Sequence, residues 1–334
     1  MFQFYKILFF LSLIIGSLIA VSSYSWLSMW MGLEINLLSI IPLLKDSKNI
    51  YPSEAAFKYF ITQALASSIL LFSIILKFNI SEFFFNNQFS LIFNSALFIK
   101  MGAAPFHSWF PEVAEGLNWM NNFILMTWQK LAPMIILFSN QFFSWFFISV
   151  IIFSSLIGGI MGLNQVSLRK ILAYSSINHI AWMLSSMLYN QTIWLFYFLI
   201  YTLISLSIIL LFNQFKMYYF PQLFQWGNQN KSLKFSLMVN FLSLGGLPPF
   251  LGFLPKWLVI NSLVNNNFYS LSFFLIVLTL IPLFFYLRLI FPSLMINTNE
   301  TLTFKSSPKK IFLMLSNFVS IFGLLICTLI FNYI

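Results

Sequence analysis

Residues 245–256 read Gly-Gly-Leu-Pro-Pro-Phe-Leu-Gly-Phe-Leu-Pro-Lys, and they interrupt a segment that is otherwise apolar and long enough to cross a membrane. A second interruption, at residues 102–111, reads Gly-Ala-Ala-Pro-Phe-His-Ser-Trp-Phe-Pro. Proline removes a backbone donor and clashes with the preceding turn, so a helix should break or kink at both places. Inside a bilayer, a broken helix is tolerated where it is buried in protein or lines a hydrated cavity. The two stretches therefore predict a pair of broken membrane helices.

The composition indicates a membrane protein. Of the 334 residues, 60% are hydrophobic and only 7% are charged, whereas a soluble domain carries about 25% charged residues. The single cysteine, Cys327, excludes an intrachain disulfide and a cysteine-based metal site, and two histidines without an acidic cluster make a metal or haem site improbable. The net charge of +10 does not indicate a nucleic-acid partner, because the basic residues form no cluster.

Apolar segments long enough to cross a bilayer recur along the whole chain. The connections between them are short and leave no room for a domain outside the membrane. The sequence therefore predicts an all-α polytopic membrane protein of about eleven transmembrane helices: 7–24, 25–44, 55–78, 89–109, 119–139, 142–163, 171–189, 193–215, 237–264, 271–291 and 311–333.

Basic residues are distributed unevenly over the two sides that these spans define. Thirteen of the 17 Lys and Arg residues fall on the side of the N-terminus, and Lys77 alone falls on the other. By the positive-inside rule, the cation-rich side faces the compartment of synthesis. The three lysines that remain, Lys100, Lys130 and Lys256, lie within predicted spans.

The two interruptions share a spacing that indicates an internal repeat. Each contains a Pro-Phe pair and then, after four more residues, another proline, at residues 105–111 and 249–255. They fall in the fourth and ninth spans, and a repeat of five spans must insert upside down because five is odd. Inverted repeats with paired broken helices are a recurring transporter architecture. We therefore expect one membrane domain of two inverted five-helix repeats, 7–139 and 142–291, followed by a C-terminal helix at 311–333.

Lys100, Lys130 and Lys256 are the strongest candidates for a functional role, because a charge in the middle of a bilayer is costly. Each could instead reach an interface or form a structural ion pair. Glu34 also lies within a span, where it could simply form a static buried ion pair. Burial lowers the pKa of a lysine side chain, and a nearby carboxylate raises it. These four residues therefore predict a proton relay.

Four other polar residues are weaker candidates. His179, in the polar patch Ser175-Ser-Ile-Asn-His, and His107, in the first interruption, have a side chain suited to proton transfer. A helix-to-helix hydrogen bond explains either histidine equally well. Glu112 and Glu115 are best explained as a solvated helix start near the cation-rich side.

Five long stretches resemble a known family. They are Met31-Gly-Leu-Glu-Ile-Asn, residues 100–112, Thr127-Trp-Gln-Lys-Leu-Ala-Pro, Ala173-Tyr-Ser-Ser-Ile-Asn-His, and residues 244–257. Together and in this order they are similar to the antiporter-like membrane subunits of respiratory complex I, and most similar to mitochondrial NADH–ubiquinone oxidoreductase chain 2 of the insect type. The resemblance runs along essentially the whole chain.

This resemblance implies specific roles and partners. Glu34 and Lys100 would be the acid–lysine pair of a first half-channel, Lys130 the connecting lysine, and Lys256 the lysine of a second half-channel, with His179 on the hydrated central axis. NADH, FMN, iron–sulfur clusters and ubiquinone would be bound by other subunits, and no cofactor by this chain. The partners would be NADH dehydrogenase subunits 4, 4L and their neighbours, with lipids such as cardiolipin, in the mitochondrial inner membrane with the N-terminus on the matrix side.

Two alternatives stay open from the sequence. A free-standing cation/proton antiporter would transport without partners and would need a further intramembrane carboxylate to hold a cation. A structural membrane subunit without transport would tolerate neutral replacements of the three lysines.

Overall fold

The computed structural model describes residues 4–46, 49–79, 86–140, 144–227 and 231–295, together with residue 323. These residues form helices and their connections, and their one β-type pairing is an isolated bridge between Ser167 and Tyr219. The predicted all-α class is therefore confirmed. The predicted helix at 311–333 lies outside the described residues apart from residue 323.

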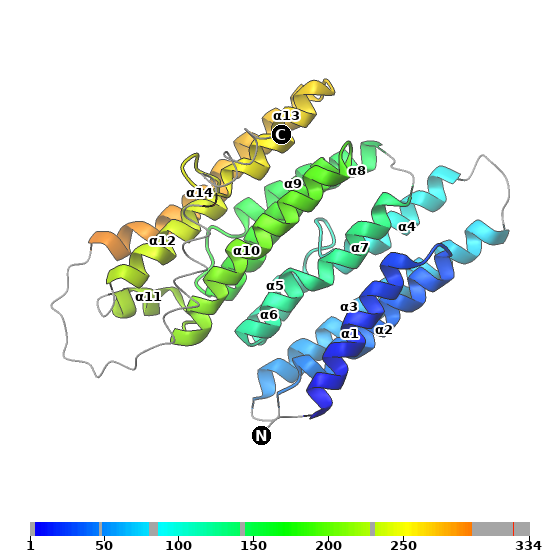
Figure 1. The fold of residues 1–334 in the computed structure, drawn as a ribbon, viewed down its shortest axis with the longest axis horizontal. Coiled ribbons are helices and arrows are strands. Elements are labelled where there is room, and N and C mark those ends of the chain that lie inside the picture. The colour runs from blue at the N-terminus through cyan, green and yellow to red at the C-terminus, as the bar shows by residue number, and fades with distance from the viewer. Residues whose placement is uncertain are drawn as a thin grey trace. The chain divides into compact units, whose positions relative to one another are not determined.

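The chain divides into two compact units, Met1–Phe153 and Ser154–Ile334. In the first unit the helices run alongside one another (Figure 1). Within this unit, α1 packs on α2, and α3 packs on α2, α4 and α5. Its described helices, besides the start of α8, are α1 Phe4–Ser22, α2 Trp26–Leu44, α3 Ile50–Asn79, α4 Asn86–Met101, α5 Trp109–Gly116, α6 Trp119–Met126 and α7 Trp128–Phe138.

Two glycines allow α1 and α2 to approach closely. A Cβ atom at Gly32 would lie 2.5 Å from the backbone nitrogen of Ala20, and one at Gly16 would lie 2.9 Å from that of Asn36. Without a hydrophobic driving force between helices in lipid, packing through small residues is a main source of helix association. These glycines therefore fix the position of α2, which carries Glu34.

The second unit is built around α9, Leu168–Met187, whose residues 171–187 are all buried. Helices α10, α13 and α14 pack against it. Gly158 of α8 also approaches closely, since a Cβ atom there would lie 2.8 Å from the backbone nitrogen of Asn178. The other helices of this part of the chain are α8 Ser144–Ile160, which begins in the first unit, α10 Gln191–Phe215, α11 Phe220–Gly227, α12 Lys231–Gly245, α13 Phe253–Asn265 and α14 Tyr269–Met295.

Among the described residues, five helices are long and apolar enough to cross a membrane: Phe4–Ser22, Trp26–Leu44, Ile50–Phe78, Gln191–Phe215 and Tyr269–Phe291. The segment Trp145–Ile160 is a shorter apolar helix. Two further predicted spans, 119–139 and 237–264, are each divided into two shorter helices, and in the predicted span 89–109 helix α4 ends at Met101 and α5 begins only at Trp109. The chain is therefore a multi-pass membrane protein, and the total of eleven spans and their inverted repeats stay predictions.

The predicted span 119–139 is interrupted at Thr127, which separates α6 from α7. The backbone of Thr127 has φ −116° and ψ −72°, and its hydroxyl donates to the carbonyl of Phe123 at 2.7 Å. Such a bond back to the preceding turn bends helices, and Pro133 takes away a further backbone donor six residues later. The sequence contained both signals, but the expectation of one continuous helix was wrong here.

A short helix, α11, lies in a region that was expected to be a polar connection. Pro221 stands in its first turn, where a missing backbone donor costs nothing. The side-chain oxygen of Gln222 accepts from the backbone nitrogens of Tyr218 and Tyr219, at 2.6 and 3.1 Å. These bonds satisfy donors that precede the helix, so proline followed by glutamine is the signal for its start.

Both predicted breaks are present, and both begin with the same turn. α4 ends at Gly102 with φ +73°, and α12 ends at Gly246 with φ +78°. In each case the glycine donates to the carbonyl three residues back, and the next residue donates to the carbonyl five residues back. This is the Schellman arrangement that ends helices at a glycine in the left-handed region. The four-residue proline spacing therefore coincides with a shared local structure.

Candidate functional site

Lys256 binds the end of the helix that is broken in front of it. Its Nζ donates to the carbonyl of Gly245 at 2.8 Å and to that of Leu244 at 3.4 Å. These carbonyls belong to the last turn of α12, where helix hydrogen bonding leaves acceptors free and the helix dipole is negative. An ammonium group is therefore stabilised there although only 7% of the Lys256 surface is exposed.

Gly246 allows this contact because it has no side chain. A Cβ atom at Gly246 would lie 2.7 Å from Cδ and 2.8 Å from Nζ of Lys256. Its positive φ is also a conformation that other L-residues rarely adopt. The break thus requires glycine at this position for two independent reasons.

The buried helix α9 presents two aromatic side chains near this part of the second unit. The Nζ atom of Lys256 lies 5.8 Å from the ring centre of Trp182, within the range of a cation–π contact. His179, one turn earlier on α9, is buried, and its Nδ1 lies 2.8 Å from the hydroxyl of Tyr197. Its ring also lies 5.0 Å from that of Tyr201, whose hydroxyl bonds to Ser176. His179 therefore belongs to a buried polar cluster between α9 and α10.

In the first unit, Lys100 and Glu34 interact electrostatically without direct contact. Lys100 stands one residue before the end of α4, with 6% of its surface exposed. The carboxylate of Glu34 is the charge that acts on it, yet these two described residues form no ion pair within 4.0 Å. Oε2 of Glu34 is buried and has no hydrogen-bond partner. The acid and the base are therefore coupled by charge without a short ion pair.

A small polar cavity lies beside Lys100. Its volume of about 10 Å³ is close to the lower limit for holding one water molecule. The polar side chains around it form a chain across three helices: Tyr59 donates to Oε1 of Gln129 at 3.1 Å, and Nε2 of Gln129 donates to Asn36 at 2.8 Å. The amide of Gln63 donates to the backbone carbonyl of Lys100 at 3.3 Å. The cavity wall therefore contains polar side chains from α2, α3 and α7, next to Leu33, Leu37 and Pro133.

Lys130 follows Gln129 directly on α7. It is the most buried of the three lysines, with 1% of its surface exposed, and its Nζ lies 4.9 Å from the ring centre of Phe110. Its backbone nitrogen donates to Thr127 at 3.2 Å, so it stands in the first turn after the interruption. The polar chain around Lys100 thus ends one residue before the second lysine.

Lys100 and Lys256 do not occupy equivalent positions in the two breaks. When the breaks are matched on Gly102 and Gly246, Lys256 corresponds to Glu112 and Lys100 to a leucine. Lys100 therefore precedes its break and lies within the electrostatic reach of a carboxylate. Lys256 follows its break and donates to backbone carbonyls. Glu112 instead accepts from Lys58 at 3.2 Å in an exposed ion pair.

The five predicted site residues thus fall into two groups. Glu34, Lys100 and Lys130 lie in the first unit, on α2, α4 and α7, and Lys256 and His179 lie on the neighbouring helices α13 and α9 of the second. His107 is half-buried in the first break, where its Nδ1 lies 3.2 Å from the carbonyl of Pro105. The described residues contain no group of three or more His, Cys, Asp or Glu side chains that could hold a metal ion.

Sequence reasoning missed the residues that connect these charges. Tyr59 and Gln63 were not predicted, and Asn36 and Gln129 were quoted only as parts of motifs. A signal was present, because Tyr59 and Gln63 are four residues apart and share one face of an otherwise apolar helix. A polar stripe on a membrane helix indicates an inward-facing surface.

Known proteins share both the sequence and the fold. Residues 23–282 match the model of the NADH:quinone oxidoreductase/Mrp antiporter transmembrane family. NADH-ubiquinone oxidoreductase chain 2 of Anopheles gambiae is 50% identical over 337 residues, which cover 97% of either chain. The protein of the same name from Oryctolagus cuniculus is 41% identical over 86% of this chain and 85% of its own.

Solved structures agree in fold. A chain of respiratory complex I from Thermus thermophilus superposes with a TM-score of 0.87 over 97% of this chain and 78% of its own, at 24% identity. A chain of the Mrp complex from Dietzia gives a TM-score of 0.75 over 90% of this chain and 62% of its own, at 17% identity. The chain therefore belongs to the NADH:quinone oxidoreductase/Mrp antiporter family, among the relatives named NADH-ubiquinone oxidoreductase chain 2.

Proposed function

We propose that this chain is a membrane subunit of the proton-pumping NADH:ubiquinone oxidoreductase, complex I, and that it moves protons without redox chemistry of its own. The observation that carries the proposal is that Lys100 is buried beside a small polar cavity and lies within the electrostatic reach of Glu34. The names of the relatives support the assignment to complex I and to the mitochondrial inner membrane.

The proposed mechanism in the first unit is electrostatic. A negative Glu34 stabilises the ammonium form of Lys100, and this stabilisation is lost when Glu34 moves away or is protonated. Lys100 then releases its proton toward Lys130 along water and the polar side chains of the cavity wall. Because Glu34 and Lys100 do not touch, their interaction can change without breaking a short ion pair.

In the second unit, we propose that Lys256 receives the proton and passes it to the far side of the membrane, with His179 on the polar axis. The carbonyls of the α12 end stabilise the charged form of Lys256. A change in the geometry of the break would weaken that stabilisation. NADH, FMN, iron–sulfur clusters and ubiquinone would bind to other subunits. The neighbours in the membrane would be subunits 4 and 4L and lipids such as cardiolipin, with the N-terminus on the matrix side.

Replacing Lys130 with methionine tests this function. Methionine keeps much of the length and the apolar packing of the side chain but cannot carry a proton. We expect an assembled complex whose number of protons translocated per electron falls, measured as proton uptake and NADH oxidation in proteoliposomes. Unchanged translocation in a fully assembled complex would rule out the relay and favour a structural subunit.

A free-standing cation/proton antiporter is the less favoured function. It would require an oxygen-rich cation site, and the described residues bring no three acidic or histidine side chains together. Proteoliposomes that contain this chain alone distinguish the antiporter from the complex I subunit. Sodium- or potassium-dependent proton flux through the isolated chain would favour the antiporter.

The hydrogen-bond chain along the cavity wall gives a prediction of smaller effect. We expect Tyr59→Phe to remove the donor to Gln129 and to destabilise the first unit by about 1 kcal/mol. Proton translocation should slow because the Gln129 amide is no longer held toward Asn36. Thermal inactivation of the solubilised complex and proton flux are the measurements. Tyr51→Phe is the matched control, since the Tyr51 side chain is exposed, and an equal loss in both variants would contradict the prediction.

A further inference from the structure

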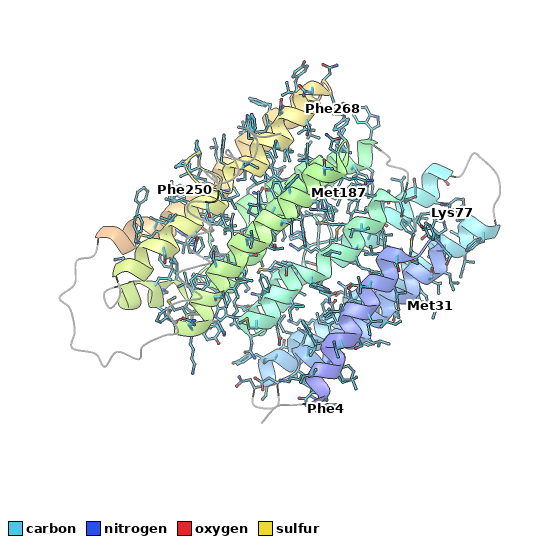
Figure 2. All side chains as sticks on the ribbon, viewed as in Figure 1. Phe4, Met31, Lys77, Met187, Phe250 and Phe268 are labelled. Carbon is cyan, nitrogen blue, oxygen red and sulfur yellow. The ribbon has the colours of Figure 1, made fainter. Side chains whose placement is uncertain are left out.

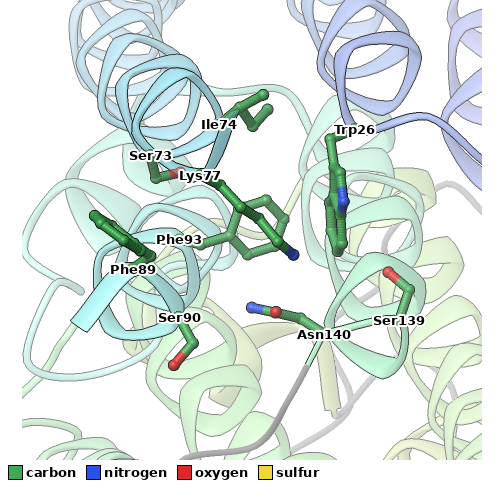
Figure 3. A pocket seen from close by; sticks show the side chains of 9 residues that line it. All are labelled: Trp26, Ser73, Ile74, Lys77, Phe89, Ser90, Phe93, Ser139 and Asn140. Carbon is green, nitrogen blue, oxygen red and sulfur yellow. The ribbon is translucent and has the colours of Figure 1, made fainter. Parts of the chain in front are cut away.

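A second polar pocket lies at the other end of the first unit and is not used by the proposed relay. Its volume is about 280 Å³, near the lower end of the range of about 300–1,000 Å³ for small-molecule sites. Figure 3 shows that the side-chain nitrogens of Lys77 and Asn140 point into it. The residues that line it are Trp26, Ser73, Ile74, Lys77, Phe89, Ser90, Phe93, Ser139 and Asn140.

The position of Lys77 along α3 places this pocket at the level of the lipid headgroups. The apolar span of α3 has 29 residues, Ile50–Phe78, which correspond to about 43 Å of helix. A bilayer with its headgroups is about 40–45 Å thick. Lys77 stands at the far end of this helix from Ile50 (Figure 2), so it lies at the membrane surface. Trp26 occupies the same level, where tryptophan is enriched in membrane proteins.

The charge of the pocket favours an anion. The Nζ atom of Lys77 lies 4.1 Å from the ring centre of Trp26, so part of the lysine is fixed against the indole. Trp26 is fixed in turn by an edge contact with Phe93 at 5.0 Å. None of the nine described residues that line the pocket is acidic. Among the described residues of the pocket wall, Lys77 is therefore a positive charge with polar neighbours and no carboxylate.

An apolar groove adjoins this pocket. Its volume is about 320 Å³, and it shares Trp26 and Ser139 with the polar pocket. The rest of its lining comes from the end of α1 and from α7 and the start of α2, and it is mainly apolar: Ala20, Val21, Ser23, Tyr24, Met29, Ile135 and Ile136. A positively charged pocket next to an apolar groove matches the two chemical parts of a phospholipid.

We propose that this pocket and groove form a binding site for an anionic phospholipid. Its phosphate lies beside Lys77, and one acyl chain follows the groove between α1 and α7. A proton pathway at this position is less well supported, because the charge of Lys77 at the mouth repels a hydronium ion. The proposal rests on the membrane location of the chain and does not depend on the proton relay.

The test uses the assembled complex, purified in detergent and labelled with a photoactivatable phosphatidylglycerol. A basic residue at a membrane surface contributes about fivefold to the binding of anionic lipid, so we expect about fivefold less labelling of this chain in Lys77→Gln. Lys77→Arg should keep the labelling. Lys45→Gln is the matched control, because it removes an exposed lysine from the opposite end of the same unit, at the end of α2. Proton translocation should be unchanged in all three variants.

Two further labelling experiments identify the ligand. A phosphatidylcholine probe should label several-fold less, and millimolar inorganic phosphate should not compete with phosphatidylglycerol. Equal labelling of the wild type and Lys77→Gln would overturn the proposal, as would full competition by inorganic phosphate. If the Lys77→Gln complex does not assemble, the Asn140→Leu variant replaces it. Asn140→Leu removes a second polar side chain from the pocket and should also reduce labelling. Undiminished labelling of Asn140→Leu would likewise overturn the proposal. Loss of translocation with normal lipid labelling, as in Lys130→Met, would concern the relay alone.

Discussion

Lys100→Met should slow proton transfer through the first unit by about 100-fold or more, the lower range for removing a positioned acid or base. The apolar side chain fills much of the same space, but no group remains beside Glu34 to accept and release a proton. The measurement is the number of protons translocated per electron, together with NADH:ubiquinone turnover, in proteoliposomes of the assembled complex.

Lys100→Arg separates a relay from a static charge. A guanidinium group keeps the positive charge that Glu34 stabilises, yet it does not lose its proton in proteins. A relay therefore fails in this variant as it does in Lys100→Met, whereas a structural ion pair survives. Lys45→Met is the control, since Lys45 is an exposed lysine at the end of α2. Normal translocation in an assembled Lys100→Arg complex would contradict the proposed role of Lys100.

The sequence predicted the two breaks because their cause is local. Proline acts on its own turn, so its effect can be read from neighbouring residues. The positive-φ glycines at 102 and 246 end both helices within the predicted segments. The contact of Lys256 with the Gly245 carbonyl was not predicted, because it depends on how the chain returns after the turn.

The hydrogen-bond network of Tyr59, Gln129 and Asn36 was harder to predict from the sequence than the breaks. Gln129 bonds to Asn36, which is 93 residues away, and to Tyr59, which is 70 residues away. Periodicity shows which face of a helix is polar, but it does not show which helix covers that face. Single charges are easy to recognise in an apolar chain, whereas neutral amides and hydroxyls are not. Yet these neutral groups provide the polar lining of the cavity beside Lys100.

The structure also changes how the two broken helices are compared. Both breaks begin with the same Schellman turn, but one lysine precedes its break and the other follows it. Lys100 lies within the electrostatic reach of a carboxylate on another helix, whereas Lys256 donates to a carbonyl at the end of α12. We therefore expect the first lysine to respond to the charge state of Glu34 and the second to respond to the geometry of the break.

Gly246→Ala tests this dependence on the break. A side chain in the left-handed region costs about 1–2 kcal/mol, and the new Cβ atom would meet Lys256 at 2.7 Å. The displaced ammonium group would lose its bond to the Gly245 carbonyl. We expect the second unit to be destabilised by about 2 kcal/mol or more, with impaired assembly and loss of proton translocation, because a charge is left buried without its acceptors. The measurements are the thermal inactivation midpoint of the solubilised complex and the protons translocated per electron.

Gly245→Ala is the matched control, and its expected effect has the opposite sign. Gly245 is the last residue of α12, and the nearest atom to a Cβ there would lie 3.6 Å away, an ordinary van der Waals contact. Alanine is favoured over glycine in a helix by about 1 kcal/mol, so this variant should be as stable as the wild type or more stable. In the double variant Gly246→Ala with Lys256→Ala, the steric contact with Lys256 is removed while the backbone strain stays, so part of the stability should return without any proton transfer. Equal stability of Gly246→Ala and Gly245→Ala would show that Lys256 does not depend on the close approach at Gly246.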